Sequence, residues 1–239
     1  MNSAAAKSTS EATSSKEPRS ERRKRERRLR LMKAAFNLMS ERGKDEVTIQ
    51  EITEAADVGF GTFYNYFDSK EAIFSTLLTE VIEHSALKVD QTARQLPDAA
   101  ERLSVGVRNT LLQAQSDPVW GGFLTHAPHN GRIFARGLGK FLKRDLQEGI
   151  AEGRFNIDDP ELTLLAVSST VIGVLSAELD RNSCAAEALA TPAEPEPGRS
   201  EDIAERTAAM VLRIVGVEDA EEVARRPLPA LTGFLNIFE

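Results

Sequence analysis

Residues 48–71 read TIQEITEAADVGFGTFYNYFDSKE, and this segment determines how the N-terminal part of the chain folds. Thr48 with Glu51 three residues later is the pattern of a capping box, in which the hydroxyl and the carboxylate each accept a backbone N–H at the start of a helix. We therefore expect a short helix over residues 49–56, ended by Asp-Val-Gly, and a second short helix over residues 60–67. Two short helices joined by about three residues that include glycine have the geometry of a helix-turn-helix.

The second of these helices has two chemically different faces. Phe63 and Phe67 are four residues apart, so they share the face that we expect to be buried. The other positions carry hydroxyl and amide groups, on Thr62, Tyr64, Asn65 and Tyr66. A helix that enters a DNA groove needs polar groups that reach phosphates and base edges, without large charges that block the approach. This segment therefore predicts a DNA-recognition helix.

The chain is acidic as a whole and basic near its start. Its 239 residues carry a formal net charge of -7, yet residues 16–44 hold 12 Lys and Arg against 4 Asp and Glu. Because the remainder is strongly acidic, we expect an anionic partner to dock at one end only. The run at residues 22–28 supplies the candidate phosphate contacts Arg22, Arg23, Lys24 and Arg25. The alternative is that this run is only a solvated helix face or a flexible tail.

Residues 58–71, VGFGTFYNYFDSKE, resemble the signature of the tetracycline-repressor (TetR/AcrR) family of bacterial regulators, which reads roughly G-T-[LF]-Y-x-[HY]-F-x-[ST]-K-E. The resemblance covers about residues 22–85, and the rest of the chain matches the family's ligand-binding and dimerisation domain by its helical layout alone. It implies contacts to the DNA backbone from Thr48, Gln50, Thr62, Tyr64, Tyr66 and Lys70, and positions nearest the base edges at Phe60, Gly61 and Asn65. Gly59 is a departure, because the family often has serine at this expected N-cap and glycine offers no hydroxyl to a phosphate.

The sequence predicts an all-α fold, with a three-helix DNA-binding domain followed by a helical effector-binding and dimerisation domain. We place a disordered arm at residues 1–19, the helix-turn-helix domain at 20–67, the helical body at 68–216 and a C-terminal tail at 217–239. Later helices are expected to begin at Asp68 with Glu71, at Pro97, at the Asp-Pro pairs 117–118 and 159–160, and at Ser200. The helix after Pro160 is expected to end near Leu179, before a loop at residues 183–200.

The effector pocket is expected in the glycine-broken region after Pro118, where aromatic and polar residues mix. Its candidate wall is Trp120, Phe123, Leu124, Phe134 and Phe141, with His126 and Arg132 near a polar head group. The expected ligand is a mainly hydrophobic small molecule, and an acidic group that pairs with Arg132 is one option. Ordinary core packing is the equal alternative for these side chains.

The helix expected at residues 160–179 is apolar on nearly every side, so we expect it to be buried from two directions. A second copy of the chain can cover the second side, which predicts a homodimer. The candidate interface residues are Leu164, Val167, Val171, Val174 and Leu175, joined by Met210 and Ile214 from the last helix.

Other classes of function find little support in the sequence. A single cysteine excludes an internal disulfide framework, and no catalytic triad or phosphate-binding glycine loop stands in a plausible context, so neither an enzyme nor a cofactor is expected. His126 and His129 lack further ligands, so no metal site is expected. The apolar run Leu162–Ala177 is short and polar for a membrane span, and no signal peptide is visible, so we expect a cytoplasmic protein without a membrane partner.

We therefore predict a sequence-specific transcriptional regulator that binds a palindromic double-stranded DNA operator as a dimer. The favoured mechanism is repression that a small molecule relieves by changing the spacing between two recognition helices. Two alternatives stay open at this point. One is a non-specific architectural DNA-binding protein, and the other is an activator of the same fold.

Overall fold

The computed structural model describes residues 18–126, 138–188 and 199–230, and these residues form helices and connecting segments but no strand. In chain order the helices are α1 (Arg19–Arg42), α2 (Ile49–Ala55), α3 (Phe60–Phe63), α4 (Lys70–Leu77), the π-helical turn η1 (Leu78–Glu83), α5 (His84–Ala93), α6 (Ala99–Ser116), α7 (Pro118–His126), α9 (Leu138–Ala151), α10 (Pro160–Ala188), α11 (Arg199–Ile214) and α12 (Ala220–Ala224). The all-α class predicted from the sequence is confirmed.

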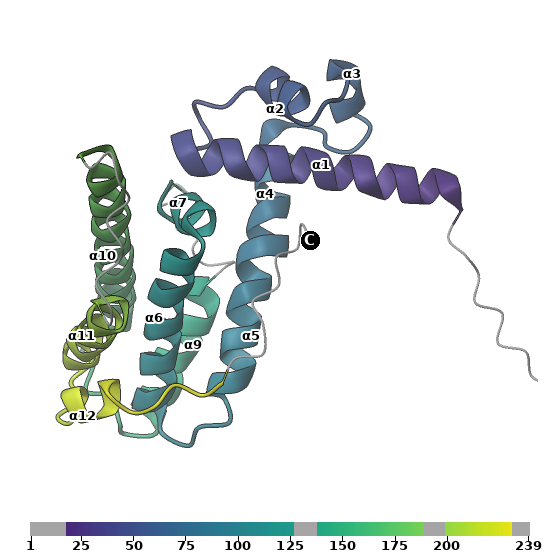
Figure 1. The fold of residues 1–239 in the computed structure, drawn as a ribbon. Coiled ribbons are helices and arrows are strands. Elements are labelled where there is room, and N and C mark those ends of the chain that lie inside the picture. The colour runs from purple at the N-terminus through teal and green to yellow at the C-terminus, as the bar shows by residue number, and fades with distance from the viewer. Residues whose placement is uncertain (1–17, 127–137, 189–198, 231–239) are drawn as a thin grey trace, which may run out of the picture.

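Two groups of helices make up the described chain (Figure 1). α1, α2 and α3 lie together at one end, where α1 lies across α4 and α7. α4, η1 and α5 follow one another as a single rod that runs from this end into the body formed by α6, α9, α10 and α11. A π-helical turn is rare and is frequently found at functional sites. The rod connects the two ends of the molecule without an extended linker.

Two later helices begin at the Asp-Pro signals that the sequence predicts. Asp117 Oδ1 accepts the backbone N–H of Trp120 at 3.0 Å at the start of α7. Asp159 Oδ1 accepts the N–H of Leu162 at 3.0 Å at the start of α10. In each case the short carboxylate satisfies an N–H group that has no partner within the helix, while proline occupies a position that needs none.

Two other starts differ from the prediction by one or two residues. At α4 the cap is Ser69 rather than Asp68, because the Ser69 hydroxyl accepts the N–H of Ala72 at 3.1 Å. α6 begins after Asp98, whose carboxylate accepts a backbone N–H, so Pro97 precedes the cap and does not open the helix. Both true caps are residues of the types that capping favours, and each stands next to the predicted one.

The C-terminal region is more helical than predicted. α10 continues to Ala188, because residues 180–188 contain neither glycine nor proline to end it. α11 begins at Arg199, within the segment that was expected to be a loop. The predicted tail contains α12, whose Ala220 and Val223 are buried against the body. Residues up to about 226 therefore belong to the helical body.

One aromatic joint fastens the DNA-binding end to the body. Phe123 of α7 packs between Phe36 of α1 and Phe74 of α4, with ring centroids 4.9 and 5.4 Å apart. α7 approaches α1 so closely that a Cβ added at Gly122 would lie 2.7 Å from the backbone oxygen of Ser40. The buried residues of both ends accordingly form one continuous hydrophobic core.

We expect Gly122→Ala to destabilise the protein by about 1–3 kcal/mol, because the new methyl group must push α7 away from α1 in a well-packed core. Chemical denaturation followed by circular dichroism measures this change. Gly106→Ala is the matched control: its Cβ would meet nothing within 4 Å, and alanine favours a helix interior. Equal unfolding midpoints for Gly122→Ala and the wild type would contradict the close approach.

Candidate DNA-binding surface and ligand cavity

The predicted capping box of α2 is present. Glu51 N donates to the Thr48 hydroxyl at 3.2 Å, and Thr48 N donates to the Glu51 carboxylate at 2.8 Å. Hydrogen bonds from the Thr48 hydroxyl and backbone, together with one from Arg42, lower the pKa of the Glu51 carboxyl from 4.5 to about 2. The box is thus complete above pH 4.5 and is lost only as the pH falls toward 2. The Thr48 hydroxyl also donates to Glu51, so it holds α2 in place.

The turn between α2 and α3 depends on Asp57, whose φ of 52° lies in the left-handed region. Asp is one of the few residues with a side chain that tolerates this conformation. Val58 N donates to Thr53 O at 3.0 Å, which closes the turn. Gly59 has an extended backbone and serves as the N-cap of α3 without a side-chain hydrogen bond, as expected for glycine. This turn sets the angle at which α3 leaves α2.

The recognition segment exposes one face and buries the other. Phe63 and Phe67 are buried, which confirms the predicted inner face. α3 itself ends at Phe63 instead of residue 67, and the next residues continue as a tight turn. On the outside, Phe60, Tyr64, Gly61 and Asn65 are exposed, while Thr62 and Tyr66 are half-buried. The structure thus brings the predicted recognition residues together on one surface.

Two residues that were predicted to contact the DNA backbone, Lys70 and Gln50, form hydrogen bonds within the protein through their side chains. Lys70 Nζ donates to the carbonyl oxygens of Val47 and Asp45 at 2.8 and 3.2 Å. An ammonium group has three donors, so Lys70 chiefly fixes the loop before α2 and keeps one donor for another partner. Gln50 donates to Glu54 on the same helix at 2.9 Å. Direct phosphate contacts by these two residues remain predictions.

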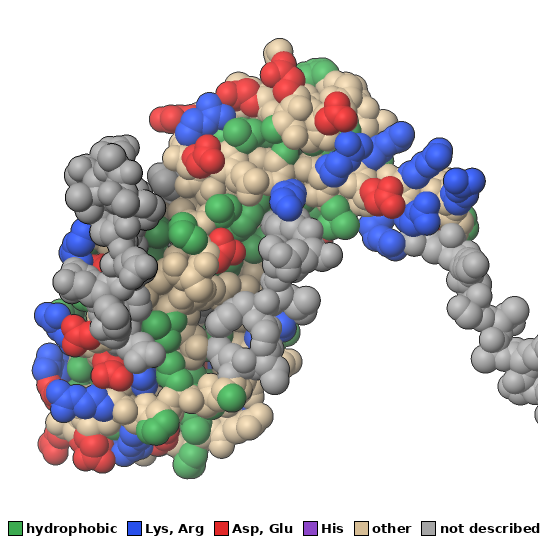
Figure 2. Space-filling view, viewed as in Figure 1, with side chains coloured by type: hydrophobic (Ala, Val, Ile, Leu, Met, Phe, Trp, Pro, Cys, Tyr) green, Lys and Arg blue, Asp and Glu red, His purple; other side chains and the backbone are tan. Residues whose placement is uncertain are grey.

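The basic run is part of a helix and not of an extended arm. Figure 2 shows Lys and Arg side chains gathered at the N-terminal end of α1, beyond its contact with the body. Arg22, Arg23, Lys24 and Arg25 all lie on its exposed first turns. Arg28 has a structural role, because it bonds to Glu80 of η1 at 2.6 and 3.2 Å and its guanidinium lies 5.6 Å from the Phe67 ring centroid.

We expect the double variant Arg23→Gln, Lys24→Gln to bind DNA with a smaller salt dependence, lower by about two phosphate contacts per protomer. The measurement is the slope of log affinity against log salt concentration on one duplex. Lys143→Gln, an exposed charge on α9, should leave the slope unchanged. An unchanged slope in the double variant would support the alternative of a solvated helix face.

The body contains a cavity of about 90 Å³ lined by residues of α5, α6, α9 and α10. Its apolar lining includes Val89, Leu103, Val107, Phe141 and Ile172. This volume is smaller than that of an engineered apolar cavity of about 150 Å³ that binds benzene, so a single small ring is the largest ligand that we expect it to accept. The polar atoms around it come mainly from one wall.

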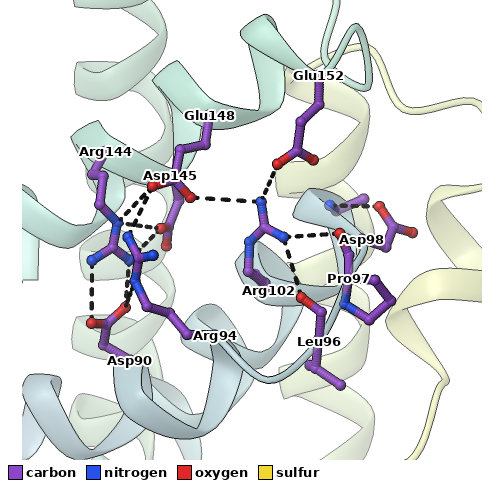
Figure 3. Close-up of polar contacts among 11 residues, drawn as sticks. Asp90, Arg94, Leu96, Pro97, Asp98, Arg102, Arg144, Asp145, Glu148 and Glu152 are labelled. Carbon is purple, nitrogen blue, oxygen red and sulfur yellow. Dashed lines mark hydrogen bonds and ion pairs between the residues drawn. The ribbon is translucent and has the colours of Figure 1, made fainter.

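This wall is a network of carboxylates and guanidinium groups (Figure 3). Arg144 of α9 bonds to Asp90 of α5 through both terminal nitrogens, and it bonds to its neighbour Asp145 at 2.5 Å. Asp90 and Asp145 line the cavity. Burial raises the pKa of the Asp145 carboxyl, and the charges of Asp90 and Glu148 add to the effect while Arg144 opposes it. A hydrogen-bond donor placed beside the Asp145 carboxylate would therefore stabilise its charged form.

Arg102 of α6 forms the second part of the wall. Its guanidinium donates to Glu152 at 2.7 Å and to the carbonyl oxygens of Leu96 and Pro97 at 3.2 and 3.0 Å, as Figure 3 shows. Its Nε is buried and has no hydrogen-bond partner within the described ranges. This N–H is the one buried donor of the cavity lining that stays unused there, so a ligand oxygen could accept from it.

The structure places three residues of the predicted effector pocket away from this cavity. Trp120, Phe123 and Leu124 of α7 are buried in the main core, where Phe123 is the central ring of the aromatic joint, and they do not line the cavity. Phe141 does line the cavity. Arg132 and Phe134 lie outside the described residues, as does the side chain of His126.

The predicted dimer residues fall on different faces of α10 and α11. Val167, Val171 and Leu175 are buried within the chain, and the first two line the cavity, which corrects their assignment. Leu164 and Val174 are half-buried. Met210 and Ile214 are exposed, as are Leu162 and Leu165, which were not predicted. Leu162 and Leu165 are three residues apart, so they share one face of the helix, and this spacing could have indicated them from the sequence.

α10 is longer than the apolar run on which the sequence analysis relied. Its segment Pro160–Arg181 is long and apolar enough to span a membrane by length and composition alone, and 17% of its most apolar 18-residue window is buried inside the chain. A buried core helix of a soluble protein passes the same test, but this helix leaves one side uncovered. The described residues contain no cluster of side chains that could hold a metal ion.

Comparison with known proteins identifies the family. Residues 31–77 match "Bacterial regulatory proteins, tetR family", and residues 98–226 match "Tetracyclin repressor-like, C-terminal domain". The chain therefore belongs to the TetR family and is a DNA-binding transcriptional regulator, as the sequence predicted. Its relatives are described as regulators, a role without catalysis.

Individual relatives agree with this assignment. This chain is similar to RolR, whose crystal structure was determined in complex with the ligand resorcinol. The two sequences are 32% identical and the TM-score is 0.65, and the match covers 89% of this chain and all of the RolR chain. The uncharacterised regulator YdgC of Bacillus subtilis is 29% identical over 63% of this chain and 77% of its own length. The repressor KstR of Mycolicibacterium smegmatis is 32% identical over 46% of this chain and 52% of its own length.

Proposed function

We propose that this protein is a repressor that binds a palindromic operator as a homodimer and releases it when a small molecule fills the cavity. The observation that carries the proposal is the rod α4–η1–α5, which contributes Asp90 and Val89 to the cavity at one end and packs against α1 at the other. A change in the position of α5 therefore changes the position of the DNA-binding helices. We expect the protein to act in the cytoplasm of a bacterium, where the DNA lies.

The mechanism needs two states that differ in the spacing of two recognition helices. Successive major grooves on one face of DNA are about 34–36 Å apart, so only one spacing fits a palindromic site. A ligand lowers operator affinity only by binding better to the other state. The coupling is reciprocal, so operator DNA must weaken ligand binding by the same factor.

The chemistry of the cavity favours a neutral ring that carries hydroxyl groups. Asp90 and Asp145 would repel a carboxylate, and Arg144 and Arg102 are already paired with carboxylates. A hydroxyl can donate to Asp145 and accept from the unused Nε of Arg102. The similarity to RolR, whose ligand is resorcinol, supports the same choice. This replaces the acidic ligand that the sequence analysis considered.

We expect resorcinol to bind the wild type and benzoate, a ring of similar size with a negative charge, to bind at least tenfold more weakly; isothermal titration calorimetry measures both. Gly106→Leu should weaken resorcinol binding at least tenfold, because Gly106 lines the cavity, a Cβ added there would meet nothing within 4 Å, and the rest of the leucine side chain would take up space in the cavity. The variant's unchanged circular dichroism and operator binding would serve as the control for folding. Preferred binding of benzoate would contradict the assignment of ligand class.

The exposed strip on α10 and α11 supports a homodimer. Leu162 and Leu165 are 62% and 60% exposed, and Met210 and Ile214 are exposed on α11, which packs against α10. Large apolar side chains that gather on one flank of a soluble protein indicate a subunit contact. Two copies related by a two-fold axis would bring α10 and α11 of each into a four-helix unit.

We expect Leu165→Glu to give a folded monomer with little operator affinity, because each dimer would otherwise bury two unpaired charges at its seam. Analytical ultracentrifugation measures the mass, and circular dichroism reports the fold. Val171→Glu is the contrasting variant, since its site lies inside the chain and the charge should unfold each subunit. A stable Leu165→Glu dimer would place the interface elsewhere.

A further inference from the structure

The most unusual side chain on the DNA-binding surface is Phe60, the first residue of α3. Its side chain is 53% exposed. Among the described residues of α1, α2, α3 and their connecting segments, Tyr64, at 51%, is the one other large apolar side chain that is exposed. The family assignment places this residue on the recognition segment. Exposure of the phenylalanine ring to water is unfavourable. The exposed ring therefore indicates a partner that offers an apolar group.

Phe60 is held in position by other rings. The Phe60 and Tyr64 rings stand edge to face with centroids 5.8 Å apart, and Tyr64 meets the fully buried Phe63 in the same way at 5.5 Å. This series of contacts anchors the exposed ring to the core, so binding costs little side-chain entropy. A Cβ added at Gly61 would meet nothing within 4 Å, so the surface beside the ring is open to a close partner.

The major groove presents one apolar group, the C5-methyl of thymine. We propose that Phe60 reads a thymine methyl in each half-site and thereby contributes to the sequence specificity of this regulator. The inference rests on the proposed binding of an operator and adds the identity of one base and the chemical basis of its recognition. Polar neighbours on the same segment, such as Asn65, remain available for hydrogen bonds to other base edges.

The test compares thymine with uracil, which differ only by this methyl group. The probe is the sequence that the wild-type protein selects most strongly from a random DNA pool, synthesised once with thymine and once with uracil. We expect the wild type to bind the uracil duplex about fourfold more weakly for each half-site, the effect of losing one buried methyl group. Selection by the wild type should also yield a constant thymine in each half-site.

The Phe60→Ala variant decides whether this residue is the reader. It should lose the part of the thymine preference that depends on the methyl contact, about fourfold for each half-site, and should select sites without the constant thymine, whereas Phe60→Leu should keep part of that preference. The variant Arg23→Gln, Lys24→Gln is the matched control, because it should lose affinity for both duplexes while the wild-type ratio persists. Uracil also changes DNA flexibility, and that effect would be the same in Phe60→Ala.

Two results would overturn the inference. The wild type could bind both duplexes equally, or Phe60→Ala could keep the full preference for thymine, which would assign the effect to another residue or to DNA shape. A third result would contradict the proposed function itself. If selection enriched no sequence at all, the operator itself would be contradicted, and the reading of thymine with it.

Discussion

The aromatic joint of Phe36, Phe74 and Phe123 is the contact on which the rest of the structure depends. It makes the three-helix unit and the helical body share a single core, and the missing side chain at Gly122 lets α7 press directly on α1. Close-packed interfaces of this kind do not deform continuously, so they respond to a displacement by moving as rigid units. A rigid joint is what a regulator needs if an event in the body is to move a DNA-binding helix.

The cavity reaches this joint through the rod. Its wall takes residues from α5, and α5 continues through η1 into α4, which carries Phe74. Arg28 clamps the π-helical turn by bonding to Glu80 while it lies against Phe67, so the turn, α1 and the recognition segment are held together. The clamp thus acts on the middle of this continuous rod, and the electrostatic wall of the cavity acts near its C-terminal end.

Local signals in the sequence were sufficient for much of the fold but not for the cavity. The capping box at Thr48, the Asp-Pro starts and the buried pair Phe63 and Phe67 depend on residues within four positions, so the sequence alone predicts them. The wall of the cavity pairs Asp90 with Arg144, 54 residues away, and no spacing indicates which helices will meet. Aromatic content was a poor guide to this cavity, because Phe123 belongs to the aromatic joint and Trp120 is buried in the same hydrophobic core.

The two faces of α10 illustrate the same limit. A helix that is apolar on nearly every side has no periodicity to separate its inner face from its outer one. Packing makes the distinction: Val167 and Val171 close the cavity, while Leu162 and Leu165 face outward. One helix therefore carries the ligand wall on one side and the proposed subunit contact on the other. A ligand that shifts α10 would then alter the placement of the partner subunit as well, so the spacing of two recognition helices would respond through the rod and through the dimer at once.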